Sequence, residues 1–270
     1  MLLSVNELIR ASAKLYQENT RLFLQYVAAA ILPTLGIIIV GFFFFMFVLA
    51  GAGNHGNSAF PDGAPTGTLI AFAIAILLAG IFSLWVSLAT VRVIAKRIMG
   101  QTVEPMAREL GTASRLVLPA IGAGVASSLL TLLGIILFFI PGVIAMGWFA
   151  FVFHAVAIDG DATRAALTRS KHLVQGRWFG LVWRLIGPAL FFGVLSLVLR
   201  GMAEFATNLF LESTAEPTLG LIVSLFSVLI SIAITIGFAP FPQIAQTILY
   251  LEAKKTPTTP PPSSQTTTTM

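Results

Sequence analysis

The chain has 270 residues, of which 57% are hydrophobic and only 10% are charged, with a net charge of +5 and a mean hydropathy of +0.92. Soluble domains carry about 25% charged residues, so this composition excludes a water-soluble globular protein and calls for lipid as the solvent. The absence of cysteine excludes disulfides, thiol catalysis and cysteine metal sites, and three histidines far apart in the sequence argue against a histidine metal site.

The first 21 residues predict an amphipathic helix rather than a cleavable signal. Polar and charged residues recur throughout them and leave no compact apolar segment of the kind that a signal peptide needs. A set of mainly apolar residues recurs with the 3.6-residue period of a helix and would share one face: Val5, Leu8, Ile9, Ser12, Leu15 and Tyr16. We expect this helix to lie in the inner membrane interface.

Six segments are apolar and long enough to cross a membrane, which takes about 20 residues of helix. Four of them are 22–50, 68–91, 178–199 and 219–250, and Pro240 and Pro242 interrupt the last. Leu116–Ile158 has no Lys, Arg, Asp or Glu and would form a helix of about 64 Å, twice the hydrocarbon thickness. It must therefore fold back, and "IPG" at Ile140–Gly142 is the predicted hinge between spans 116–139 and 143–158.

The basic residues set the orientation of these spans. All but one of the 16 Lys and Arg lie in 1–21, 92–115 and 159–184 or at Lys254 and Lys255, and only Arg200 lies in an opposite loop. The positive-inside rule therefore predicts that both termini and both basic loops are cytoplasmic. A single span over 116–158 would put one basic loop outside, so the charges independently support a hairpin.

The remaining segments are interpreted by their composition. A helical spacing predicts a short interfacial helix in the outer loop 200–218, formed by Met202, Phe205, Ala206, Leu209 and Phe210. The loop 51–67 is expected to be flexible, and the Thr/Pro-rich tail 256–270 to be disordered and cytoplasmic. Residues 1–255 then form a single integral membrane domain.

The spans offer few ionisable groups, which mark function when they lie at membrane depth. His154 is either a hydrogen-bonded interfacial histidine or a proton relay. Arg184 is either an interface anchor or a ligand for lipid phosphate. Small residues repeat every four positions in two spans, at Ala71, Ala75, Ala79, Ser83 and Ser87 and at Ser227, Ser231, Thr235 and Ala239. These stripes indicate close helix packing or, as the alternative, a hydrophilic substrate path.

The most polar stretch is "DGDATRAALTRSKHLVQGRW" at 159–178. It predicts a surface helix capped by Asp159 or Asp161. Ser170 and His172 are two residues apart and point to different helix faces, which argues against a catalytic pair. The candidate contacts to anionic inner-leaflet lipid are Arg164, Arg169, Lys171, Arg177 and Arg184. In the other basic loop Glu104 and Glu109 are expected to be solvated or to pair with Arg108 or Arg115.

The segment 138–185 resembles a bacterial and archaeal family of six-span membrane domains, which is attached to some glycerophosphodiester phosphodiesterases and also occurs alone. The matching positions are the "IPG" at Ile140–Gly142 and Ala166, Leu167, Ser170, Leu173, Val174, Gly176 and Trp178, with Lys171 in place of the family's aromatic residue. Both ends of the chain also look like the family's ends. The resemblance implies a prokaryotic plasma membrane. The phosphodiesterase activity belongs to a separate metal-binding barrel, for which this chain has no room.

The sequence therefore predicts an all-α polytopic membrane helix bundle with six transmembrane helices and amphipathic interfacial helices. We expect no enzymatic activity, no cofactor, no metal and no nucleic-acid partner. The first hypothesis is a membrane module that acts through helix packing and through contacts with inner-leaflet lipid or with a protein partner. The alternative is a transporter or exporter subunit for a small or amphiphilic molecule, because hydroxyl stripes and proline-broken helices can build a binding site.

Overall fold

A computed structural model describes residues 2–52, 66–213 and 217–256. Every secondary-structure element in these ranges is a helix, so the predicted all-α class is confirmed. Most of the predicted loop 51–67 and of the tail 256–270 lies outside the described residues. The elements are α1 (Val5–Glu18), α2 (Thr20–Ala52), α3 (Thr66–Ile98), α4 (Met106–Leu137), α5 (Phe139–Trp148), α6 (Val152–His154), the π-helical turn η1 (Ala155–Asp159), α7 (Thr163–Val174), α8 (Trp178–Ser213), α9 (Pro217–Phe238) and α10 (Pro240–Lys255).

Five helical runs are long and apolar enough to cross a membrane, and the chain is a membrane protein by this measure. They are Ile70–Ile98, Met106–Leu137, Phe139–Asp159, Trp178–Glu212 and Thr218–Lys255, counted over the described residues. Each contains or overlaps one predicted span. The predicted span 22–50 lies within α2, which is 33 residues long. This helix is long enough to cross a membrane, and a sixth crossing stays a prediction.

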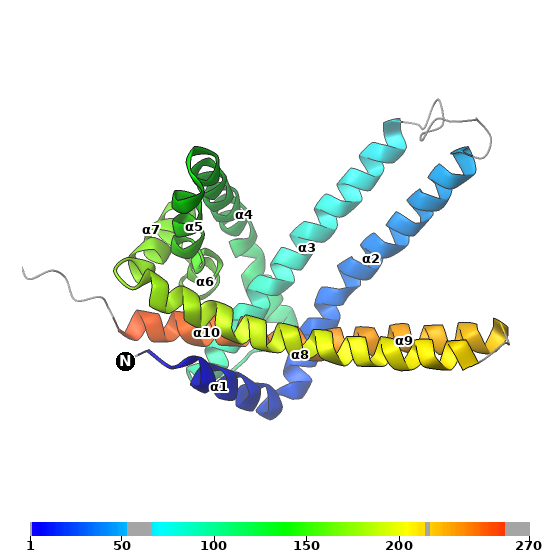
Figure 1. The fold of residues 1–270 in the computed structure, drawn as a ribbon. Helices are drawn as coiled ribbons and strands as arrows, with labels where there is room; N and C mark the ends of the chain where they lie inside the picture. The colour runs from blue at the N-terminus through cyan, green and yellow to red at the C-terminus, as the bar shows by residue number, and fades with distance from the viewer. Residues whose placement is uncertain (1, 53–65, 214–216, 257–270) are drawn as a thin grey trace, which may run out of the picture.

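Three helical hairpins in the described residues extend from a common base (Figure 1). The base comprises α1, α6, η1, α7, α10 and the ends of α3, α4 and α8 that contact them. The hairpins pair α2 with α3, α4 with α5, and α8 with α9, and they lean away from the base in different directions. Their outer parts expose large apolar side chains, among them Leu77, Leu133, Phe139, Leu197 and Phe226. A surface of this kind is unstable in water, so lipid or another apolar chain must cover it.

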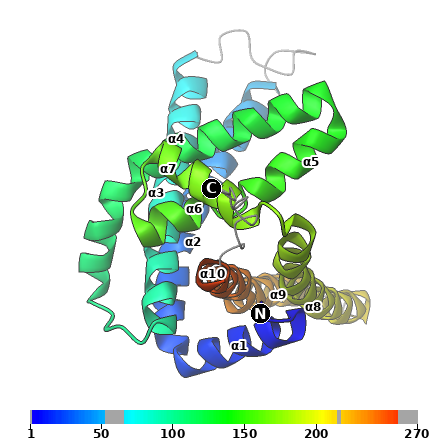
Figure 2. The same ribbon diagram turned by 90° about the vertical axis from the view of Figure 1, so that its left-hand side faces the viewer.

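The base holds most of the buried core, and α10 lies at its centre. Figure 2 shows α10 between α1, α3 and α8, all three of which it contacts. Its side chains Ile244, Leu249 and Tyr250 are fully buried. The predicted amphipathic helix forms as α1, capped by the Ser4 hydroxyl, but its apolar face with Leu8 packs against α8 and α10 instead of lying on lipid.

The hinge of the α4–α5 hairpin is at Phe138, not at the predicted Ile140–Gly142. Phe138 has an extended backbone (φ −157°, ψ 138°) between the two helices, while Pro141 sits in the first turn of α5. Proline is tolerated in a first turn because no intrahelical N–H is needed there. Gly142 has another role. A Cβ atom at that position would lie 2.7 Å from the backbone nitrogen of Ile135, so glycine is what lets α5 pack directly on α4.

The predicted span 143–158 is not one continuous helix. It breaks after Trp148, where the Ser170 hydroxyl of α7 donates to the Trp148 carbonyl at 2.6 Å and accepts from the Phe151 N–H at 3.1 Å. One buried side chain thus satisfies a donor and an acceptor that the break leaves without helical partners. The chain then resumes as α6 and widens into η1, which ends at Gly160 in the left-handed conformation (φ 72°).

Two further predictions concern the last spans. The predicted short helix at 202–210 does not form as a separate element, because these residues belong to α8, which runs without interruption from Trp178 through Gly201 to Ser213. The predicted interruption of the last span is confirmed, since α9 ends at Phe238 and α10 begins at Pro240. Pro240 and Pro242 have no N–H to give to the carbonyls four residues earlier, which weakens the helix at this point.

Candidate functional site

The structure places three of the five candidate lipid-binding cations in internal hydrogen bonds. Arg169 bonds Asp161 through both Nε and Nη2, and this hydrogen bond raises the pKa of the guanidinium above its ordinary value. Arg177 donates to the carbonyls of Leu173, Ala253 and Thr256. Burial lowers the pKa of Arg177 from its ordinary value.

Arg184 is the third of these cations and bonds the N-terminal segment. Its Nε donates to the Leu3 carbonyl at 2.7 Å and its Nη1 to the Gly180 carbonyl at 2.9 Å. It therefore joins α8 to the residues that precede α1. The other two candidates, Arg164 and Lys171, are exposed on α7, with the Lys171 Nζ 4.7 Å from the centre of the Trp148 ring. Contact with anionic lipid stays a prediction, now concentrated on these two side chains.

Asp159 joins three elements of the base through its carboxylate and does not cap α7, although the sequence predicts that it would. Its Oδ2 accepts from the Tyr250 hydroxyl at 2.5 Å, its Oδ1 accepts from the Lys254 Nζ at 2.5 Å, and Arg169 Nε lies 3.4 Å away. The residue at the start of α7 is Ala162, which makes no side-chain cap. Asp159 is unavailable for capping because its carboxylate ties η1 to α7 and α10.

A second group of charged side chains surrounds Glu109, which was expected from the sequence to lie in a solvated loop. The residue is fully buried, its Oε1 lies 2.5 Å from Lys96 Nζ, and its Oε2 lies 3.9 Å from Arg92 Nε. The Arg92 Nη1 also donates to the carbonyl of Ala157 at 3.0 Å. The expected pairing with Arg108 or Arg115 is wrong, because α4 begins at Met106 and its first turn points this carboxylate at α3. We use the name basal network for Asp159 with its partners Tyr250, Lys254 and Arg169, together with Glu109 and its partners Lys96 and Arg92.

The small-residue stripes lie on two of the hairpins. On α3, Ala75, Ala79 and Ser87 are half-buried, whereas Ala71 and Ser83 are exposed. On α9 and at the junction with α10, Ser227 and Ser231 are half-buried and Thr235 and Ala239 are exposed, with the Thr235 hydroxyl accepting from Arg200 of α8. The α9 stripe therefore contacts a neighbouring helix in part, while the lower end of the α3 stripe opens onto a cavity.

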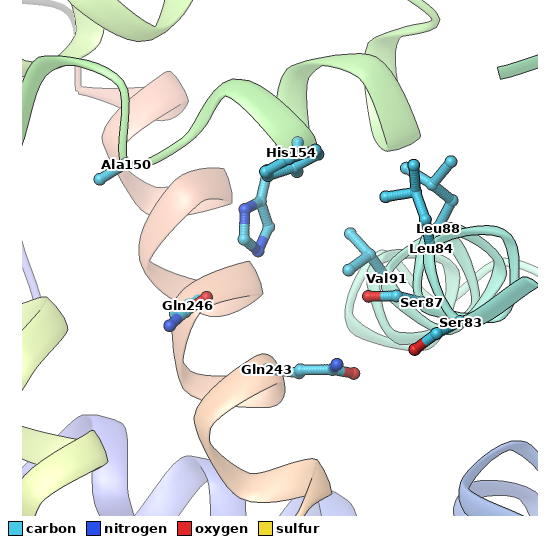
Figure 3. Close-up of a pocket in the computed structure, with 10 residues that line it drawn as sticks. Ser83, Leu84, Ser87, Leu88, Val91, Ala150, His154, Gln243 and Gln246 are labelled. Atoms are coloured by element: carbon cyan, nitrogen blue, oxygen red, sulfur yellow. The ribbon is translucent and has the colours of Figure 1, made fainter. Parts of the chain in front are cut away.

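This cavity is the candidate functional site, and its volume is about 330 Å³ (Figure 3). Three parts of the chain supply its polar lining: Ser83 and Ser87 from α3, His154 from α6, and Gln243 and Gln246 from α10. Leu84, Leu88, Val91, Ala150 and Phe153 supply the apolar lining. The site lies where both interrupted spans meet, because α6 follows the break of one and α10 follows the break of the other.

His154 is the most unusual group of the cavity. It is only 5% exposed, and neither ring nitrogen has a hydrogen-bond partner among the described residues. Its ring packs beside Phe151 (6.0 Å between centres) and Tyr250 (5.8 Å) and extends toward α10 (Figure 3). Neither sequence interpretation fits fully. The ring is not hydrogen-bonded at an interface, and no relay partner contacts it within the described ranges.

The other polar side chains of the cavity are also without internal partners. Many helical hydroxyls in the described residues bond the carbonyl one turn earlier, as Thr90 does to Val86 at 2.8 Å and Ser12 to Leu8 at 2.7 Å. Within the described part of the chain, the side chains of Ser83, Ser87, Gln243 and Gln246 make no such bond. Ser83 is exposed and the other three side chains are half-buried, so their free hydrogen-bonding groups can face solvent or a solute in the cavity.

Of the polar residues that line the cavity, the sequence pattern indicates Ser83, Ser87 and His154 but not Gln243 and Gln246. The two glutamines directly follow the Pro240–Pro242 break, and their positions there were the only signal available. Comparisons of the chain with protein-family models, with curated proteins and with solved structures find no match.

Proposed function

We propose that the protein binds a small, uncharged polar molecule in the His154 cavity and serves as a transporter or exporter subunit. The observation that carries the proposal is the convergence on one cavity of five polar side chains that have no hydrogen-bond partner among the described residues. The cavity volume of about 330 Å³ is at the lower end of small-molecule sites. Burying His154 without a partner costs stability, and this cost is expected where function requires the group.

The helix breaks at the cavity support a role in transport. Transporters commonly build their sites from interrupted helices, whose ends and side chains face the solute. Here one wall follows the break at Trp148 and the other follows the break at Ala239, and the π-helical turn η1 directly follows His154. π-Helical turns are frequent at functional sites.

The location of the cavity fits a membrane orientation with the base on the cytoplasmic side. Ser87 precedes Arg92 by five residues, about 7.5 Å along a helix, so the cavity extends from the basic inner boundary into the hydrocarbon region. Binding rather than catalysis is the proposal, because none of the described residues that line the cavity is a carboxylate able to orient His154 as a general base.

A cysteine scan tests the proposal, since the native chain has none. Single variants Ser83→Cys, Ser87→Cys, Ser227→Cys and Ser231→Cys are reconstituted in vesicles and treated with the water-soluble reagent hydroxyethyl methanethiosulfonate. We expect labelling at the two cavity positions and none at the two α9 positions, which carry the same residue type in an equally apolar helix. Labelling absent from all four would contradict the proposal.

The exposed basic face of α7 favours a second role in contact with anionic inner-leaflet lipid. Arg164 and Lys171 are its candidate side chains, each adding about 1 kcal/mol near a charged membrane surface. The double variant Arg164→Ala/Lys171→Ala should retain less phosphatidylglycerol after purification from mixed-lipid vesicles. Arg108→Ala/Arg115→Ala, which removes two exposed cations from α4, is the matched control. Equal lipid retention in the two double variants would contradict this role.

A further inference from the structure

A second cavity of about 200 Å³ lies against the first. It is bounded by α2, α3 and the start of α10, and it shares Ser83, Ser87 and Gln243 with the His154 cavity. In Figure 3 the Gln243 side chain points from α10 toward the two serines of α3. These three polar side chains therefore form the boundary between the two cavities.

We infer that the two cavities form one continuous site for an uncharged molecule bearing hydroxyl or amide groups, and that Gln243 determines its specificity. This inference rests on the proposed binding function and adds the extent of the site, the ligand class and the deciding residue.

The second cavity repeats the chemistry of the first. Tyr26 lines it and is only 1% exposed, yet the Tyr26 hydroxyl has no partner among the described residues. Each cavity is thus lined by one deeply buried aromatic side chain, Tyr26 or His154, with a polar atom that has no hydrogen-bond partner among the described residues. Satisfying both requires water or a ligand with polar groups at separated positions.

The ligand class follows from the lining. Neither cavity is lined by Asp, Glu, Lys or Arg in the described residues. The nearest cations on α3, Arg92 and Lys96, already lie beside Glu109. An ion would therefore lose its hydration without gaining an opposite charge, whereas a hydroxyl or amide can exchange hydrogen bonds with serine and glutamine.

Gln243 is the deciding residue because of its position and its chemistry. It borders both cavities, its amide offers a donor and an acceptor, and no internal hydrogen bond holds it. Gln246 lies one helical turn later and borders only the first cavity. The chain therefore provides a matched control of the same residue type on the same helix.

The test uses two conservative reporters in the full chain, Ala150→Cys in the first cavity and Ala30→Cys in the second. The rates of modification by hydroxyethyl, sulfonatoethyl and trimethylammonioethyl methanethiosulfonate are compared in vesicles. We expect the uncharged reagent to react fastest at both reporters. Adding Gln243→Glu, which keeps the side-chain shape, should favour the cationic over the anionic reagent by about tenfold at both reporters, because one charge then faces both cavities.

The Gln246→Glu control should produce this change at Ala150→Cys and little change at Ala30→Cys. If Gln243→Glu alters only one reporter, the cavities are separate and the inference is wrong. If a charged reagent reacts fastest at both reporters of the unaltered site, the ligand class is wrong. Failure of every reagent at both reporters would instead overturn the proposed binding function itself, so the two outcomes are distinguishable.

Discussion

The basal network and the His154 cavity are both polar regions of an apolar protein, yet their polar groups are paired to different extents. In the base Asp159 accepts from two donors, Glu109 Oε1 bonds Lys96, and the two atoms without a hydrogen bond, Glu109 Oε2 and Arg92 Nε, still face each other as an ion pair at 3.9 Å. In the cavity His154 is almost as deeply buried and has no partner within the described residues. The difference separates groups that hold the fold together from groups that are available to a solute. Residue type and burial alone cannot make this distinction.

The strongest test of the comparison removes the carboxylate at Glu109. We expect Glu109→Ala to lower the free energy of unfolding by about 3–5 kcal/mol, because Lys96 and Arg92 would remain partly buried without a counter-charge. Denaturant unfolding in detergent measures the change. Glu104→Ala, which removes an exposed carboxylate five residues earlier, should cost much less. Similar losses in the two variants would contradict a structural role for the basal network.

Ser170 offers the next largest effect. Its hydroxyl serves both the Trp148 carbonyl and the Phe151 N–H, so Ser170→Ala leaves two groups at the helix break unpaired. We expect the free energy of unfolding to fall by about 1–3 kcal/mol. Thr168→Ala on the same helix is the control, because the Thr168 hydroxyl is exposed and bonds only its own helix. A cost for Thr168→Ala equal to that for Ser170→Ala would show that the break does not depend on this serine.

The sequence alone was sufficient to predict the class and most of the helices, because a lipid environment requires long apolar segments. It failed where tertiary contacts decide. The hinge lies at Phe138 and not at Ile140–Gly142, where Gly142 instead packs closely on α4, and α8 continues past residue 199. Three predicted lipid cations proved to bond backbone carbonyls or a carboxylate. Partners of this kind lie up to 181 residues away, as for Arg184 and Leu3, and no local pattern reveals them.

The cavity was only partly predictable for the same reason. A four-residue repeat marked Ser83 and Ser87, but the repeat looks identical on α9, where Ser227 and Ser231 do not line this cavity. Only the fold brings α10 opposite α3 and shows which stripe borders the His154 cavity.

A substitution in the cavity should have the reverse character from those in the base. We expect His154→Phe to leave the free energy of unfolding within about 1 kcal/mol of the native value or to raise it, because the ring contacts are kept and two unpaired buried nitrogens are removed. The same variant should slow modification of Ala150→Cys by the uncharged thiol reagent. Tyr250→Phe is the control, since it keeps the aromatic packing but removes the hydroxyl bond to Asp159 and should destabilise. A large loss of stability in His154→Phe would place this histidine with the basal network.

The smallest effect is expected where a polar group is satisfied but exposed, at the start of α1. The Ser4 N–H and hydroxyl both donate to the Glu7 carboxylate, and these hydrogen bonds lower the pKa of Glu7 from its usual value of 4.5. Because the folded-state pKa is the lower one, the stabilisation is fully present above pH 4.5 and is lost as the pH falls through the folded-state pKa. Ser4→Ala should therefore exchange the α1 amide hydrogens faster than the native chain near neutral pH, and the difference should shrink in acid. Glu18→Gln, at the other end of α1, controls for general charge effects. A difference between Ser4→Ala and the native chain that is independent of pH would show that the hydroxyl acts without the carboxylate, and that satisfaction at the surface follows different rules from satisfaction in the base.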